Sequence, residues 1–169
     1  MVGASGRGAG PQPMIELKGE IADRSGTILS VVCDCRMSRR IQVLIIEDEP
    51  SVADAIRLIL EENGYEAVSV ETARAGIDEC RRRPFDVIIT DFRLPDMSGL
   101  DVLRQLREED SAHPAVIVIT AYPTPHLHSE ATGLGAIEVL PKPFSPSALL
   151  TAVATAVSSH ASGHGSTSR

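Results

Sequence analysis

Short apolar runs alternate with amphipathic stretches through the middle of the chain. Five runs have the composition of buried strands, at residues 41–46, 65–70, 85–90, 115–120 and 137–140. Stretches with apolar residues at helical spacing follow them, at residues 50–62, 73–83, 98–108, about 126–134 and 145 to about 158. This alternation predicts a doubly wound α/β fold, in which helices cover both faces of a five-stranded parallel sheet.

Local signals mark where several of these helices begin and end. Gly64 closes the first helix, and Pro84 forces the end of the second. Thr72 is placed to cap the second helix, while Ser145 and Pro146 form a cap and first-turn pair that opens the last one. These signals agree with the hydrophobic pattern on every boundary that they define.

The two ends of the chain differ in composition from the patterned middle. Residues 1–36 begin with a Gly-, Ala- and Pro-rich stretch, and residues 159–169 consist mainly of Ser, Gly and His. We expect a disordered or non-native extension at 1–36, a domain at 37–158 and a disordered tail at 159–169. A possible strand at 27–32 has no partner of clear pattern.

Charge and composition exclude several classes of function. The formal net charge is −7, and an acidic domain repels nucleic acid, so direct nucleic-acid binding is not expected. No apolar run reaches the roughly 18 residues that a membrane helix needs. Three cysteines, an odd number, do not predict a disulfide scaffold. We therefore expect a cytoplasmic protein without a membrane segment.

Polar residues stand at the ends of four predicted strands. Glu47 and Asp48 follow the first strand, Asp91 the third and Lys142 the fifth, and Thr120 ends the fourth. Parallel strands place these ends at one edge of the sheet, where ligands bind in such folds. Clustered carboxylates repel one another, and hard oxygen ligands open to solvent suit Mg²⁺. With a lysine and a hydroxyl nearby, the set predicts a phosphoryl-transfer site.

Four segments are similar to the motifs of one family. They are IQVLIIEDEP at 41–50, FDVIITDFRLPDMSG at 85–99, VIVITA at 116–121 and VLPKPF at 139–144. In this order they resemble the receiver domain of two-component response regulators, over roughly residues 41–158. The resemblance implies a chemotaxis-regulator-like, flavodoxin-like fold with strand order 2-1-3-4-5.

The resemblance also implies roles at the metal and phosphoryl positions. Asp91 matches the phosphoacceptor, and Asp48 matches the direct Mg²⁺ ligand. Glu47 matches the acidic companion of that ligand, at a position where aspartate is commoner. Arg93 matches the position whose backbone carbonyl, and not its side chain, completes the metal site.

Other matched positions concern the response to phosphorylation. Thr120 matches the hydroxyl that moves to the phosphoryl group, and Ala121 a small residue whose backbone N–H faces that group. Lys142 matches the phosphate-contacting lysine, whose bond to Pro143 is expected to be cis. Val139 departs from the pattern, because many members carry a Tyr or Phe there that swings inward on activation. The departure leaves the conformational readout open and does not affect the chemistry.

The function implied by this resemblance is phosphorylation-dependent signalling by a single-domain response regulator that is not an enzyme. Its expected partners are a sensor histidine kinase or phosphotransfer protein and a downstream protein target. Because residues 147–158 carry no charge, a charge-paired dimer is not expected, and the protein should be a monomer or weak dimer. One alternative is a phosphorylation-independent receiver-like binding module, which Val139 leaves open. Another is a Mg²⁺-dependent phosphohydrolase, which usually has a second aspartate where this chain has Arg93.

Four further features have a simpler structural interpretation. The C-x-C at 33–35 lacks the matching pair of a metal site, and Cys80 is expected to pack within its helix. The arginines at 81–83 close a helix, where cations offset the helix dipole. His126 and His128 are two residues apart, so on a helix they would point to different sides.

Overall fold

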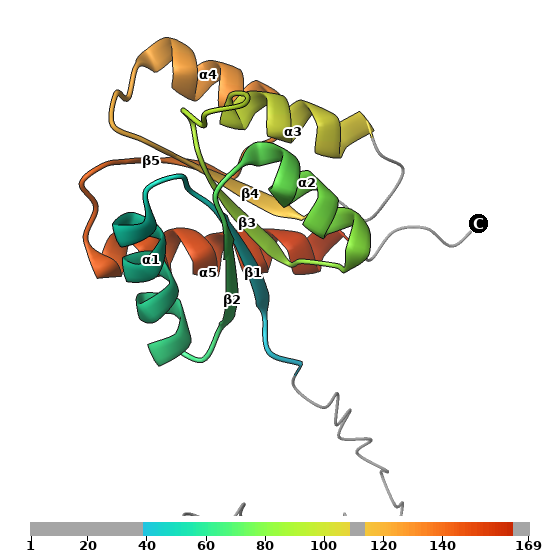
Figure 1. Cartoon of the computed structure of the whole chain (residues 1–169), viewed down its shortest axis with the longest axis vertical. Helices are drawn as coiled ribbons and strands as arrows, with labels where there is room; N and C mark the ends of the chain where they lie inside the picture. The colour runs from blue at the N-terminus through green and yellow to red at the C-terminus, as the bar shows by residue number, and fades with distance from the viewer. Residues whose placement is uncertain (1–38, 109–113, 164–169) are drawn as a thin grey trace, which may run out of the picture. The chain divides into compact units, whose positions relative to one another are not determined.

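A computed structural model describes residues 39–108 and 114–163. Five strands and five helices alternate along these residues. The strands are β1 (Gln42–Ile46), β2 (Glu66–Val70), β3 (Val87–Asp91), β4 (Ala115–Thr120) and β5 (Glu138–Pro141), and the helices are α1 (Pro50–Glu62), α2 (Ala73–Arg82), α3 (Gly99–Glu108), α4 (Pro125–Gly133) and α5 (Pro146–Gly163) (Figure 1). All strand pairs are parallel and their order is β2-β1-β3-β4-β5. The predicted fold class and the strand order are therefore confirmed.

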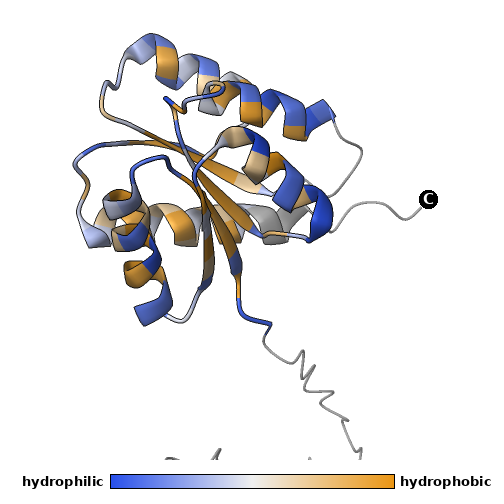
Figure 2. Ribbon diagram, viewed as in Figure 1, coloured by the Kyte–Doolittle hydropathy of each residue, from blue (hydrophilic) through white to orange (hydrophobic). Residues whose placement is uncertain are grey.

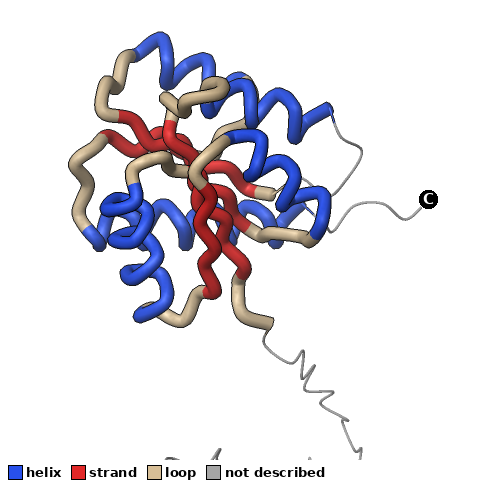
Figure 3. The backbone as a smooth tube through the Cα atoms, in the orientation of Figure 1, coloured by secondary structure: helices blue, strands red, loops and turns tan. Residues whose placement is uncertain are grey.

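The sheet forms from the most apolar segments of the chain (Figure 2). Strands β3 and β4 are rich in β-branched residues, which favour extended backbone, and they are buried at every position. Strand β2 lies at the edge of the sheet and is only partly buried. Figure 3 shows the strands enclosed between helices, with the connecting loops at the strand ends.

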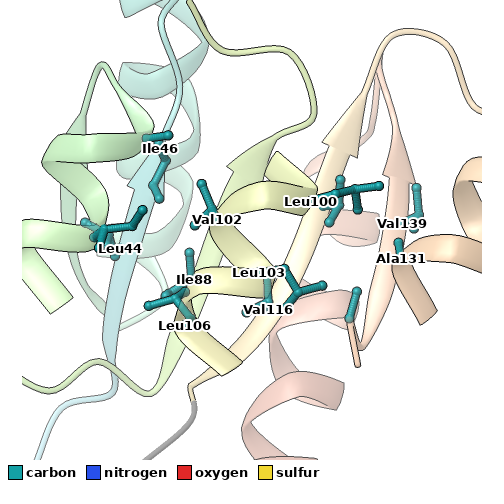
Figure 4. Close-up of a cluster of buried hydrophobic side chains, with 14 of the residues drawn as sticks. Leu44, Ile46, Ile88, Leu100, Val102, Leu103, Leu106, Val116, Ala131 and Val139 are labelled. Carbon is teal, nitrogen blue, oxygen red and sulfur yellow. The ribbon is translucent and has the colours of Figure 1, made fainter. Parts of the chain in front are cut away.

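Side chains that alternate along the strands supply two separate apolar layers. On one face Leu44, Ile88 and Val116 join a cluster that includes residues of α2, α3 and α4 (Figure 4). On the other face Val43 and Ile89 join a cluster that includes residues of α1 and α5. The continuous apolar runs of the sequence are thus explained, because both sides of each central strand face a helical layer.

The helix boundaries follow local capping chemistry. Thr72 accepts a hydrogen bond from the Ala75 N–H at 3.2 Å, and Ser145 accepts one from the Ala148 N–H at 3.2 Å. Both caps were predicted from the sequence. Thr124 caps α4 in the same way, through the Leu127 N–H at 3.1 Å. Gly64 follows α1 with φ +85°, a backbone conformation that favours glycine.

Helix α5 is longer than the sequence pattern predicted. It continues to Gly163, past the expected end near Ser158. The serines of this segment are accommodated within the helix, where the Ser158 and Ser159 hydroxyls donate to the carbonyls of Ala154 and Thr155 at 2.9 Å. The expectations for 1–36, including the strand at 27–32, and for 164–169 fall outside the described residues. Within residues 39–108 and 114–163, no helix has the length and apolar character required to cross a membrane.

The parallel register aligns the strand ends that carry the polar residues. Ile46 pairs with Thr90, Asp91 with Ile119, and Thr120 with Pro141. The last residues of β3, β4 and β5, and the residue after β1, consequently lie at one edge of the sheet.

Candidate functional site

Three acidic side chains gather where β1 and β3 end. Glu47 and Asp48 follow β1, and Asp91 is the last residue of β3. One carboxylate oxygen from each lies within 4.8 Å of the others. Glu47 is 1% exposed and Asp91 9%, whereas Asp48 faces solvent. The fold therefore brings together the acidic residues that the sequence predicted to cluster.

Lys142 reaches this cluster from the segment after β5. Its Nζ donates to Glu47 Oε2 at 2.7 Å and also to the carboxylate of Asp91. Its backbone N–H donates to the Thr120 carbonyl at 2.7 Å, and its bond to Pro143 is cis, as predicted. The backbone thus fixes the lysine beside two carboxylates that are otherwise shielded from water.

The loops after β3 and β4 contact each other beside the acidic cluster, through Arg93 and Tyr122. The Arg93 N–H donates to Asp91 Oδ1 at 2.9 Å, while the Arg93 guanidinium lies 4.4 Å from the centre of the Tyr122 ring. The Thr120 hydroxyl accepts from the Tyr122 N–H at 3.1 Å. Ala121 between them is exposed. The side chain of Arg93 is therefore engaged by Tyr122, and the role expected for its carbonyl stays a prediction.

Gly99 packs directly against the backbone of Asp91 because it has no side chain. A Cβ at this position would lie 2.4 Å from the Asp91 carbonyl oxygen, closer than any unstrained contact. The Gly99 N–H instead donates to the carbonyl of Phe92 at 2.9 Å. The start of α3 can therefore pack directly against the end of β3.

Residues 43–154 match the family model described as the response regulator receiver domain. The match includes the acidic cluster, Thr120 and Lys142. The chain belongs to this family. Receiver domains are modules of two-component response regulators, and the acidic cluster of this one resembles the Mg²⁺ site of the family.

Relatives and solved structures agree with this assignment. The sensory transduction protein RegX3 of Mycobacterium tuberculosis is 38% identical over 108 residues, which are 64% of this chain and 47% of that protein. The chain spans between 25% and 55% of the lengths of curated relatives that it matches.

Two solved receiver domains are similar over most of the described chain. The receiver domain of a LuxO repressor protein from Vibrio parahaemolyticus has a TM-score of 0.70 and 33% identity, and the match covers 74% of this chain and 95% of that one. The beryllofluoride-activated NtrC4 receiver domain, a dimer, has a TM-score of 0.67 and 31% identity, covering 70% and 98%.

The donor set of this receiver domain fits a hard divalent cation. Carboxylate oxygens are the ligands that Mg²⁺ prefers, and it usually retains several waters. Glu47 and Asp91 supply buried oxygens, while the exposed Asp48 leaves one side open to solvent. These three residues would hold the ion. Among the residues that the structure describes, Glu47, Asp48 and Asp91 form the group of three acidic, His or Cys side chains that lie close enough together to bind one metal ion.

Burial and Lys142 control the charge of the cluster together. Burial raises the pKa of Glu47 above its ordinary value, and the hydrogen bond and positive charge of Lys142 only partly oppose this effect. For Lys142, burial alone would lower the pKa, but its hydrogen bonds to Asp91 and Glu47 outweigh burial and raise it. The lysine therefore stays charged at neutral pH.

Sequence reasoning missed two side chains of the receiver domain that organise these loops. Tyr122, which stacks on Arg93, stands out only as an aromatic residue shortly after β4. Asp96 accepts hydrogen bonds from the N–H groups of Ala73 and Arg74, at 3.0 and 2.9 Å, and so joins the loop after β3 to α2. Its place three residues before Gly99, in a turn-rich segment, was the available signal.

The other features of the sequence have structural roles where the structure describes them. Cys80 packs against the apolar cluster. The arginines at 81–83 pair with Asp78 and Glu79 on the same helix. His126 Nδ1 lies 3.8 Å from Oε2 of Glu130, which is one helical turn further along α4. The C-x-C at 33–35 lies outside the described residues.

Proposed function

We propose that this chain is a response regulator that accepts a phosphoryl group on Asp91 from a sensor histidine kinase or phosphotransfer protein. The observation that carries the proposal is the cluster itself. A largely buried carboxylate contacts a charged lysine and lies within 4.8 Å of two further carboxylates. Interaction with such kinases or phosphotransfer proteins is general for receiver domains.

The transfer step needs little beyond positioning and charge stabilisation. A carboxylate oxygen of Asp91 attacks the phosphorus of a phosphohistidine, and the P–O bond forms as the P–N bond breaks. The electron pair of the broken bond leaves with the imidazole nitrogen. Lys142 donates to the transferred oxygens as it now donates to Asp91. Mg²⁺ held by Glu47, Asp48, Asp91 and the Arg93 carbonyl would neutralise the charge on those oxygens.

The response begins at Thr120. Its hydroxyl accepts from the Tyr122 N–H in the unphosphorylated arrangement. When Thr120 turns to donate to the aspartyl phosphate, that N–H loses its acceptor, and the loop leading to α4 must rearrange. Phosphorylation thus shifts the equilibrium between two arrangements of this loop and helix. Hydrolysis by water resets the protein.

The output is proposed to be a downstream protein target, with no direct contact to nucleic acid. We infer that this receiver domain acts as a monomer or weak dimer, modifies itself and acts on no separate substrate. The second candidate is a receiver-like binding module that works without phosphorylation. Val139 favours it, because this buried side chain replaces the aromatic residue that many members move on activation.

Mass spectrometry separates these two functions. With Mg²⁺ and acetyl phosphate, the wild type should gain about 80 Da, the mass of one phosphoryl group. Asp91→Asn should gain none, because an amide does not attack phosphorus. Asp54→Asn, which alters an exposed aspartate on α1, is the matched control and should label like wild type. Labelling of Asp91→Asn would exclude Asp91 as the acceptor, and a folded wild type that never labels would favour the binding module.

A further inference from the structure

Helix α4 is anchored weakly by its apolar side chains. It buries Leu127 and Ala131, whereas α3 buries residues along its whole length, namely Gly99, Leu100, Val102, Leu103 and Leu106. Both buried residues of α4 join the cluster that contains Leu100 and Val139 (Figure 4). Burial of apolar surface usually supplies most of the free energy that keeps a helix packed on its domain. Because α4 buries little of it, polar contacts contribute a larger share of that free energy for α4.

Two arginines of α3 supply such contacts. Arg104 Nη2 lies 2.6 Å from Glu130 Oε1, in the middle of α4. Arg107 Nη2 donates to the Gly135 carbonyl at 2.9 Å, just after α4 ends. Figure 1 shows α3 and α4 side by side on one face of the sheet. We call these two contacts the α3–α4 ties.

The chain accommodates the second tie at Gly135. This residue has φ +91°, and a Cβ built on it would lie 2.7 Å from Arg107 Nη2. Any other residue would both strain the backbone and displace the guanidinium. Glycine here therefore permits the approach of Arg107 to the end of α4.

Further contacts connect the Arg104–Glu130 pair to the loop that follows Asp91. Arg104 Nη1 lies 2.7 Å from Asp101 Oδ1, and Asp101 Oδ2 accepts from the Ser98 hydroxyl at 2.6 Å. Ser98 forms an isolated antiparallel bridge with Arg93, two residues after Asp91. Contiguous contacts couple two sites only when an element between them has two arrangements, and α4 is the element that Thr120 would move.

We propose that the α3–α4 ties hold α4 in its unphosphorylated arrangement, and that phosphorylation acts against them. The inference rests on the proposed function, and it names the regulation of the same site. Val139 cannot provide an aromatic switch, so the position of α4 itself carries the signal. Weakening a tie therefore shifts the population toward the activated arrangement before any phosphoryl group is present.

Hydrogen exchange of the unphosphorylated protein tests whether the ties exist in solution. Arg104→Met and Glu130→Gln should each speed exchange of the α4 amides about two- to fivefold, the range for an exposed ion pair. The double variant should exchange more slowly than the sum of the two single effects predicts, because the Arg104–Glu130 pair is lost in both single variants, while Arg104 also pairs with Asp101 and Glu130 also lies near His126. Arg57→Met is the control, since Arg57 pairs with Asp54 and Glu61 within α1.

Affinity for Mg²⁺ and beryllofluoride, a mimic of the phosphoryl group, tests the regulatory part by calorimetry. If the ties oppose the activated arrangement, reciprocity of coupled equilibria requires Arg104→Met to bind the mimic about two- to fivefold more tightly than wild type. Equal affinity for Arg104→Met and wild type would overturn the inference, as would unchanged α4 exchange. A wild type that binds no mimic and takes up no phosphoryl group would instead refute the proposed function, while α4 exchange would still decide whether the ties hold.

Discussion

The acidic site and the exposed face of α5 are built from side chains of opposite character. At the site, buried Glu47 and Asp91 surround the ammonium of Lys142. On α5 the exposed residues are small and uncharged, and the hydroxyls of Thr151 and Thr155 donate to carbonyls of their own helix at 2.8 and 2.9 Å. The site is organised for charge, whereas this face offers mainly shape.

This difference shows that the chemistry and the readout have different origins in the sequence. Each charged residue of the site stands at a strand end, so the parallel sheet alone brings it into place. The position of α4, on the inference above, depends on side chains of α3 that lie outside the four motifs. The following predictions test how independent the two regions are.

The largest effect is expected at Lys142. Lys142→Met should slow phosphoryl uptake by about 100-fold, since removal of one preorganised donor to a developing charge typically costs that much. The initial rate of mass gain with acetyl phosphate measures the effect. Arg57→Met, which removes an exposed cation on α1, should leave the rate unchanged. An equal rate for both variants would show that the site does not depend on its own cation.

Steric tolerance should also differ between the two regions. Gly99→Ala should lower the free energy of unfolding by about 1–3 kcal/mol, as expected for overpacking, because the new Cβ meets the Asp91 carbonyl oxygen at 2.4 Å. Gly133→Ala at the end of α4 meets nothing within 4 Å and should stabilise by about 0.5–1 kcal/mol. Urea unfolding of both variants provides the comparison, and equal stability losses would contradict it.

The fold was predictable because its signals are local and repeated. Apolar runs gave the strands, and Thr72, Ser145 and Gly64 marked helix ends that the structure confirms. The acidic cluster was predictable for a related reason. Strand direction alone determines which edge a residue such as Asp91 reaches, so no knowledge of side-chain packing was needed.

The features that the sequence did not predict depend on tertiary contacts. Stacking of Arg93 on Tyr122 and the pairing of Arg104 with Glu130 join residues far apart in the chain. Their geometry depends on how two loops or helices pack. The end of α5 was misplaced because a Ser-rich composition resembles a disordered tail, while its hydroxyls in fact bond to the helix.

A smaller effect is expected at Asp96, which joins the site loop to α2. Asp96→Ala should lower the free energy of unfolding by about 1 kcal/mol, the usual cost of losing a helix-capping side chain. The reason is that the N–H groups of Ala73 and Arg74 lose their acceptor. Urea unfolding at neutral pH measures the loss, and no loss would show that α2 holds its first turn without the site loop.

The same residue gives a pH dependence of known sign. Desolvation opposes ionisation of the exposed Asp96, but the hydrogen bonds from the N–H groups of Arg74 and Ala73 outweigh it and hold its pKa below the ordinary value of 3.8. A lowered pKa in the folded state stabilises fully above the unfolded value and is lost as the pH falls through the folded value. The difference in free energy of unfolding between wild type and Asp96→Ala should therefore be constant at neutral pH and shrink below pH 3.8. Urea titrations between about pH 7 and pH 3 follow it.

The smallest effect is expected for salt on association through α5. The exposed positions of this helix include Thr151, Ala154, Thr155, Ser158 and Ser159, which line one open hollow. Because residues 147–158 of α5 carry no charged side chain, charge pairs cannot form across this face. Salt therefore has few electrostatic interactions there to screen. We predict a monomer, or a weak dimer whose dissociation constant is unchanged between low and high salt, with and without the phosphoryl group. Sedimentation under these four conditions measures it. A tight phosphorylation-induced dimer that dissociates at high salt would show that this face, like the acidic site, works through charge.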